Sequence, residues 1–117
     1  SAFNPNYIVA LMVDREGVVW TGTWGGGLSR FDGKKWSHYT MADGLPGNHV
    51  FMLNEDPSGK LWVGTNNGLA SLENGKFKVI TTDDGLFSNT VFSMATAADG
   101  SLWIGSFGGV THLAAPK

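Results

Sequence analysis

Apolar residues along this chain come in short runs that are separated by turn residues. In the middle of the chain the runs cover residues 50–54, 61–65, 69–72 and 77–81, with Gly, Asn, Asp or Pro between them. Short runs rich in β-branched, aromatic and aliphatic side chains predict β-strands. The connections at 56–59 and 74–76 carry Asp-Pro-Ser-Gly and Asn-Gly, which favour tight hairpin turns. We therefore expect antiparallel strands, and no segment predicts a helix.

The whole pattern occurs three times. Three equivalent tryptophans are 42 and 41 residues apart, namely Trp20, Trp62 and Trp103. Three equivalent glycines are 41 and 41 residues apart, namely Gly27, Gly68 and Gly109. A four-stranded antiparallel unit of about 41 residues has the size of a β-propeller blade. The sequence predicts an all-β chain of about three four-stranded blades. They cover approximately residues 6–41, 48–82 and 89–117, and the last lacks its outer strand.

The place of a strand within its blade predicts its burial. The first strands should be buried on both faces, because residues 7–13 and 50–53 are continuous apolar runs. The repeated tryptophans should pack between blades. Asparagines recur just before the first strands, where they are expected to hold the turn, and they are Asn6, Asn48 and Asn89.

An incomplete row of blades predicts a partner. Fewer than three complete blades cannot close a ring, and an open row exposes an apolar face at each end. Pro116 and Lys117 fall where the third outer strand should begin, and the chain starts at Ser1 without a methionine. We expect either an excised part of a longer propeller or copies that associate into a ring.

Composition narrows the classes of partner. The chain has 117 residues, a net charge of -2 and no run of Lys or Arg, so neither nucleic acid nor a membrane surface is an expected partner. No apolar stretch is long enough to span a bilayer. Cysteine is absent, which excludes disulfides, thiolate metal sites and a cysteine nucleophile.

The polar residues do not predict a catalytic centre. Asp14, Asp56 and Asp99 lie at equivalent or nearly equivalent turns, so the repeat explains them. No histidine pair has zinc-ligand spacing, and neither a calcium loop nor a Gly-x-Ser-x-Gly motif occurs. We expect no metal, no cofactor and no enzymatic activity, and a propeller lyase or glycan-active enzyme is the less favoured alternative.

Candidate ligand-binding residues are those at which the copies differ. The loops between the second and third strands converge near the axis of a propeller, where ligands commonly bind. In these loops the first copy has Trp24, the second has Asn66 and Asn67, and the third has Phe107. Aromatic rings could stack on sugars, and asparagines could hydrogen-bond them. His49 could point into the channel. The alternative is a surface loop that varies because nothing constrains it.

The repeats resemble a known family. The stretches "LPGNHVFMLNEDPSGKLWVGTNNGLASLENGKF", "LFSNTVFSMATAADGSLWIGSFGGV" and "SRFDGKKWSHYTMADGLPGN" are similar to the two-component regulator propeller repeat. The resemblance implies the extracytoplasmic sensor of a bacterial hybrid two-component system, periplasmic or extracellular, that detects a small ligand and often an oligosaccharide. A purely structural or protein-interaction role is the alternative.

Overall fold

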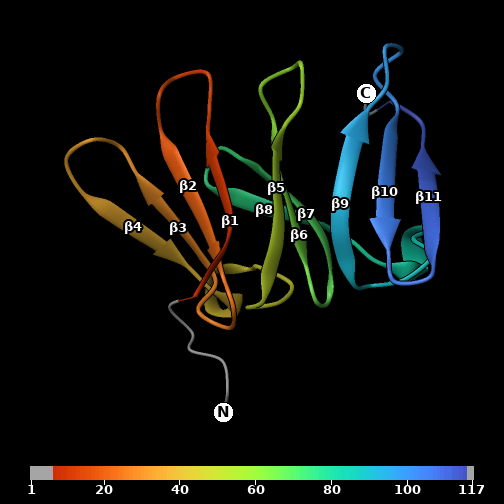
Figure 1. Cartoon of the computed structure of the whole chain (residues 1–117), viewed down its shortest axis with the longest axis horizontal. Coiled ribbons are helices and arrows are strands. Elements are labelled where there is room, and N and C mark those ends of the chain that lie inside the picture. Colours follow the sequence, from red (N-terminus) through yellow and green to blue (C-terminus); the bar gives the residue numbers. More distant parts are fainter. Residues whose placement is uncertain (1–6, 116–117) are drawn as a thin grey trace.

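The computed structural model describes residues 7–115, which form three antiparallel sheets placed side by side (Figure 1). We call the sheets blades 1, 2 and 3. Blade 1 contains β1 (Ile8–Val13), β2 (Val19–Thr23), β3 (Leu28–Phe31) and β4 (Trp36–Tyr39). Blade 2 contains β5 (Val50–Glu55), β6 (Leu61–Thr65), β7 (Gly68–Glu73) and β8 (Lys76–Ile80). Blade 3 contains β9 (Val91–Thr96), β10 (Leu102–Ser106) and β11 (Gly109–Leu113).

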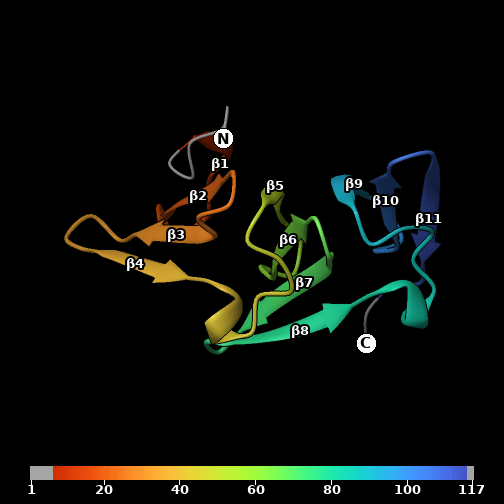
Figure 2. The same cartoon turned by 90° about the horizontal axis from the view of Figure 1, so that it is seen from below.

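Each blade is a meander in which neighbouring strands in the sequence are neighbours in the sheet. This arrangement confirms the predicted all-β fold of propeller blades. In Figure 2 the first strands of the blades, β1, β5 and β9, lie along one side of the molecule, while β4 and β8 extend away from it. The predicted positions of Asn6, Pro116 and Lys117 lie outside the described residues.

The links between blades contain short helical turns that the sequence analysis missed. η1 (Met41–Asp43) and η2 (Thr82–Asp84) are 3-10 turns, each closed at its N-terminus by a threonine and at its C-terminus by a glycine with positive φ. The expectation of a chain without helix was therefore wrong for these two links. Each turn also receives a fixed partner from the next blade, because Asn48 Oδ1 accepts from Met41 N and Asn89 Oδ1 from Thr82 N, at 2.9 and 2.8 Å. The structural role predicted for these two asparagines is confirmed.

The core lies between the blades. Val50 at the start of β5 belongs to the same buried cluster as Val18, Trp20 and Leu28 of blade 1, and an equivalent cluster joins blades 2 and 3. Trp20 and Trp62 are buried, as predicted for residues between blades, but the prediction was wrong for Trp103, which is 46% exposed because no described blade covers it. Burial of one large aromatic side chain stabilises the fold by about 4–6 kcal/mol as an upper bound.

The predicted burial of the first strands on both faces was wrong. Every residue of β5 is buried or half-buried, but β1 has only exposed and half-buried residues, and half of the β9 residues are exposed. The second strands β2 and β6 are the most buried ones. The reason is geometric, because each face of a first strand needs a neighbouring blade to cover it, and among the described residues only blade 2 has a blade on both sides.

Candidate functional site

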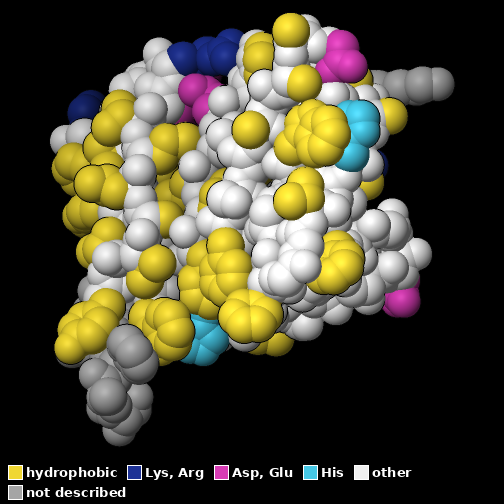
Figure 3. Space-filling view, turned by 45° about the vertical axis from the view of Figure 1, so that its right-hand side comes forward, with side chains coloured by type: hydrophobic (Ala, Val, Ile, Leu, Met, Phe, Trp, Pro, Cys, Tyr) yellow, Lys and Arg dark blue, Asp and Glu magenta, His cyan; other side chains and the backbone are white. Residues whose placement is uncertain are grey.

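Five aromatic rings form a continuous row across the three blades. The aromatic row consists of Trp24, His49, Phe51, Phe92 and Phe107. Ring centroids are 5.0 Å apart for Trp24 and His49, 5.8 Å for Trp24 and Phe51, 5.1 Å for Phe51 and Phe92, and 6.4 Å for Phe92 and Phe107. These separations are typical of favourable aromatic pairs. Figure 3 shows hydrophobic side chains gathered along the lower edge of the molecule, the edge at which the β2–β3 and β10–β11 loops lie in Figure 1.

The loop after β2 places Trp24 against the start of blade 2. Trp24 and His49 form an isolated antiparallel bridge, and Trp24 N donates to Tyr7 O at 3.0 Å. The ring of His49 also stacks on Phe51, with 8° between the planes. His49 Nδ1 is buried and has no hydrogen-bond partner among the described residues. His49 therefore contributes its ring to the row, which brings together two of the predicted site residues.

At the other end, the row becomes accessible to solvent. Phe92 on β9 is 43% exposed, and Phe107 at the tip of the β10–β11 loop is 77% exposed. Phe51 and Phe92 occupy equivalent positions in their first strands, where blade 1 has Val9. The sequence analysis missed both phenylalanines, because each lies in an apolar run that reads as core.

The two predicted asparagines hold a loop in place. Asn66 Oδ1 accepts from His49 N at 3.3 Å, and Asn66 N donates to His49 O at 3.1 Å. Asn67 Nδ2 donates to Pro46 O at 3.2 Å. Both side chains are thus engaged with the segment that leads into β5, beside the middle of the aromatic row. The amide of Asn66 supports His49 rather than extending the row.

Two carboxylates of the repeat lie at the opposite end of the strands and accept hydrogen bonds from the turns. Asp56 Oδ1 accepts from the backbone N–H groups of Ser58 and Lys60 and from the Ser58 hydroxyl, and Oδ2 accepts from Trp62 Nε1 at 2.9 Å. Burial acts to raise the pKa of Asp56, but these hydrogen bonds outweigh burial and keep the pKa below its ordinary value. The Asp14 carboxylate has the equivalent bond to Trp20 Nε1 at 3.0 Å, and the pKa of Asp14 is lowered in the same way. Both carboxylates are fixed parts of the repeat.

Within residues 7–115, no group of three or more His, Cys, Asp or Glu side chains is placed to hold a metal ion. In the same residues, no helix has the length and apolar character needed to cross a bilayer.

Comparison with known proteins decides the family. The model described as two component regulator propeller matches residues 2–25, 44–67 and 85–108, which together exceed half of the chain. This chain belongs to the two component regulator propeller family. Each matched segment begins ahead of a blade, runs through its first two strands and ends in the loop that follows. The Trp24 and Phe107 loops of this propeller segment therefore lie inside the family repeat. No curated protein matches the sequence.

Solved structures share the fold. The extracellular domain of a putative hybrid two component system from B. thetaiotaomicron superposes with a TM-score of 0.82 at 22% identity, over 97% of this chain and 16% of that one. The extracellular domain of a putative one component system from the same organism superposes with a TM-score of 0.77 at 23% identity, over 92% of this chain and 16% of that one. Virginiamycin B lyase from Staphylococcus aureus superposes with a TM-score of 0.73 at 16% identity, over 97% of this chain and 43% of the lyase. The propeller segment spans about a sixth of the two extracellular domains.

Proposed function

We propose that this propeller segment belongs to a non-catalytic ligand-binding module that senses a small molecule outside the cytoplasm. The observation that carries the proposal is the aromatic row, which runs across all three blades and becomes solvent-exposed at Phe107. The similarity to extracellular domains of putative one and two component systems supports the sensory role and a periplasmic or extracellular location. Fixed rings on paired strands and short loops offer a preorganised surface, which reduces the entropy lost on binding.

The chemistry of the row favours an uncharged oligosaccharide. The face of an aromatic ring carries the negative part of its quadrupole and attracts the C–H groups on one face of a sugar ring. The row carries no carboxylate or Lys or Arg side chain of its own, so a charged ligand would find no counter-ion in it. Several rings in succession fit a ligand with repeated sugar units better than a single small ring.

Binding of oligosaccharides tests this function. We expect at least one hexasaccharide among those derived from xylan, cellulose and chitin to raise the unfolding temperature and to bind in calorimetry. Trp24→Ala and Phe107→Ala should each weaken binding about tenfold, because each removes one stacking surface. Trp36→Ala is the matched control, since Trp36 is an exposed tryptophan on the outer strand β4, outside the row. Absence of binding by the whole panel, or an equal loss in the Trp36 variant, would contradict the proposal.

A second candidate function is assembly through the two outer blade faces. Ile8 is the counterpart of Val50 and Val91; both valines are 0% exposed, whereas Ile8 is 57% exposed. At the other end Trp103 is 46% exposed, although its counterparts Trp20 and Trp62 are 6% and 3% exposed. The repeat therefore makes each outer face complementary to a further blade, from the same longer chain or from a second copy. We propose that such a blade covers them.

The molar mass in solution tests this assembly. We expect light scattering on the 117-residue chain to give a mass well above 12.5 kDa, because an open row leaves large apolar faces in water. Leu11→Lys should shift the population toward the monomer, since Leu11 is 68% exposed on β1. Val79→Lys, on the outer strand β8, is the control and should leave the mass unchanged. A clean 12.5 kDa monomer for the unaltered chain would refute the proposed association.

A further inference from the structure

An arginine connects blades 1 and 2 at the ends of their first strands. Arg15, in the turn after β1, donates from Nη2 to the carbonyl oxygens of Asp56 and Pro57 at 2.9 and 3.2 Å. Its Nε lies 3.5 Å from Glu55 Oε2, and its backbone N donates to Glu55 Oε1 at 2.9 Å. Its guanidinium group also lies beside Gly59. The guanidinium group thus occupies a defined position between the two turns.

The equivalent position between blades 2 and 3 holds no arginine. The repeat replaces Arg15 by Pro57 and Glu55 by Thr96, while Gly59 has Gly100 as its counterpart. A cavity of about 300 Å³ lies there. It is lined by Asp56, Pro57, Ser58, Lys60, Thr96, Gly100 and Ala115. The lining therefore includes the counterparts of the arginine, of its acidic partner and of the glycine beside it.

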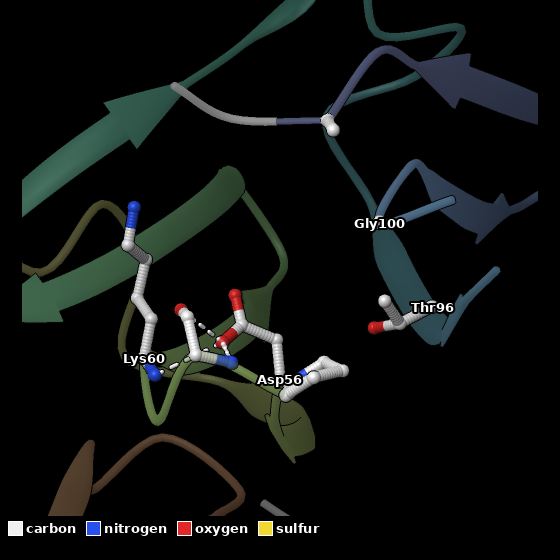
Figure 4. Close-up of a pocket in the computed structure, with 7 residues that line it drawn as sticks. Asp56, Lys60, Thr96 and Gly100 are labelled. Atoms are coloured by element: carbon white, nitrogen blue, oxygen red, sulfur yellow. Dashed lines mark hydrogen bonds between the residues drawn. The ribbon is translucent and has the colours of Figure 1, made fainter. Parts of the chain in front are cut away.

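The lining of this cavity presents unused hydrogen-bonding capacity. Thr96 Oγ1 is buried and has no hydrogen-bond partner among the described residues. In Figure 4 this oxygen points across the cavity toward Asp56, while Gly100 lies on the same side as Thr96. The charge of Lys60 at the rim is already matched, because its Nζ lies 2.7 Å from Glu73 Oε1. A buried hydroxyl without a partner is costly, which favours a ligand that supplies one.

We propose that the cavity between blades 2 and 3 is a binding site for a guanidinium group, such as the side chain of an arginine in a bound peptide. The planar guanidinium group carries five N–H donors, one of which suits the Thr96 hydroxyl. By the repeat, the carbonyl oxygens of Ala97 and Ala98 in the turn after β9 are the counterparts of the two that Arg15 contacts, so we expect them to accept further donors. The site is independent of the aromatic row, which lies at the opposite ends of the strands.

Titration with ethylguanidinium chloride, followed by the backbone amide signals in NMR, tests this site. We expect saturable shifts confined to residues 56–60 and 96–100, and much smaller shifts with ethylammonium chloride at the same concentration. Thr96→Val, which keeps the shape and removes the hydroxyl, should weaken binding about fivefold. Ser106→Ala is the matched control, because Ser106 carries another buried hydroxyl without a partner in blade 3, at the far end of β10. It should leave the affinity unchanged.

A second variant tests the correspondence between the two interfaces. Pro57→Arg places an arginine where blade 1 has Arg15, so its own guanidinium group should occupy the cavity and abolish the shifts caused by ethylguanidinium. Equal shifts with ethylammonium, shifts spread over the whole chain, or unchanged affinity in the Thr96→Val variant would overturn the proposal.

Discussion

Replacing Asp56 by alanine is expected to lower the free energy of unfolding by about 3 kcal/mol or more. The Asp56 carboxylate satisfies three donors of its own turn and the indole N–H of Trp62, which is 3% exposed. Alanine leaves these donors without their acceptor in a site that water reaches poorly. Asp56→Asn should also destabilise the fold. An amide group has one acceptor oxygen, whereas the carboxylate uses one oxygen for the turn and the other for the indole. Urea unfolding followed by tryptophan fluorescence measures both losses.

Asp83→Ala is the control for this variant, since Asp83 is an exposed acidic residue of η2. Its effect should stay within about 0.5 kcal/mol. Equal stability of the Asp56→Ala and Asp83→Ala variants would contradict the role assigned to the buried carboxylate.

The same carboxylate makes stability depend on pH in acid. The pKa of Asp56 in the folded state lies below its ordinary value of 3.8, so folding favours the ionised form. The stabilisation is complete above pH 3.8 and disappears as the pH falls through the lower folded pKa. The free energy of unfolding of the unaltered chain should therefore depend little on the ionisation of Asp56 near neutral pH and should fall in acid. The Asp56→Ala variant should show a shallower acid dependence.

The fold could be predicted because its determinants are local and repeated. The strands of blade 2 begin and end within one residue of the runs that the hydrophobic pattern defines, since glycine, asparagine and proline mark each turn. The helical turns in the links were missed, although Thr40 and Asp43 have the spacing of a capping box. Burial of the first strands was mispredicted, because an apolar run does not reveal whether a neighbouring blade is present.

The candidate sites depend on contacts between blades, which the sequence pattern does not contain. Trp24 and His49 were recognised by their departure from the repeat, but the phenylalanines that connect them to Phe107 look like core residues. Arg15 and Glu55 are 40 residues apart, and only the packing of two turns brings them together. The cavity beside Thr96 becomes visible when this contact is compared with its missing counterpart. Repetition thus predicts the scaffold, and the departures from it have to be placed in space.

Replacing Gly64 by alanine is expected to lower the free energy of unfolding by about 2–3 kcal/mol. Gly64 lies in β6 at a point where Val91 of the next blade comes close to its Cα. A Cβ atom at this position would lie 2.8 Å from Val91 Cγ1 and 2.8 Å from Val91 O. The carbonyl oxygen belongs to the backbone of β9 and cannot rotate away, so the two blades would have to separate. Urea unfolding of the Gly64→Ala variant measures the cost.

Gly105→Ala is the matched control for this last variant. Gly105 has the same place in β10, but the atom nearest to an added Cβ is the Ser93 hydroxyl of the same blade, which can rotate to another position. The control should therefore lose less than about 1 kcal/mol. Because both substitutions add one methyl group to a glycine in a second strand, backbone entropy changes similarly in both. The difference between the two losses in the free energy of unfolding therefore reports the packing of one blade on the next. Equal losses would show that close approach between blades does not stabilise this fold.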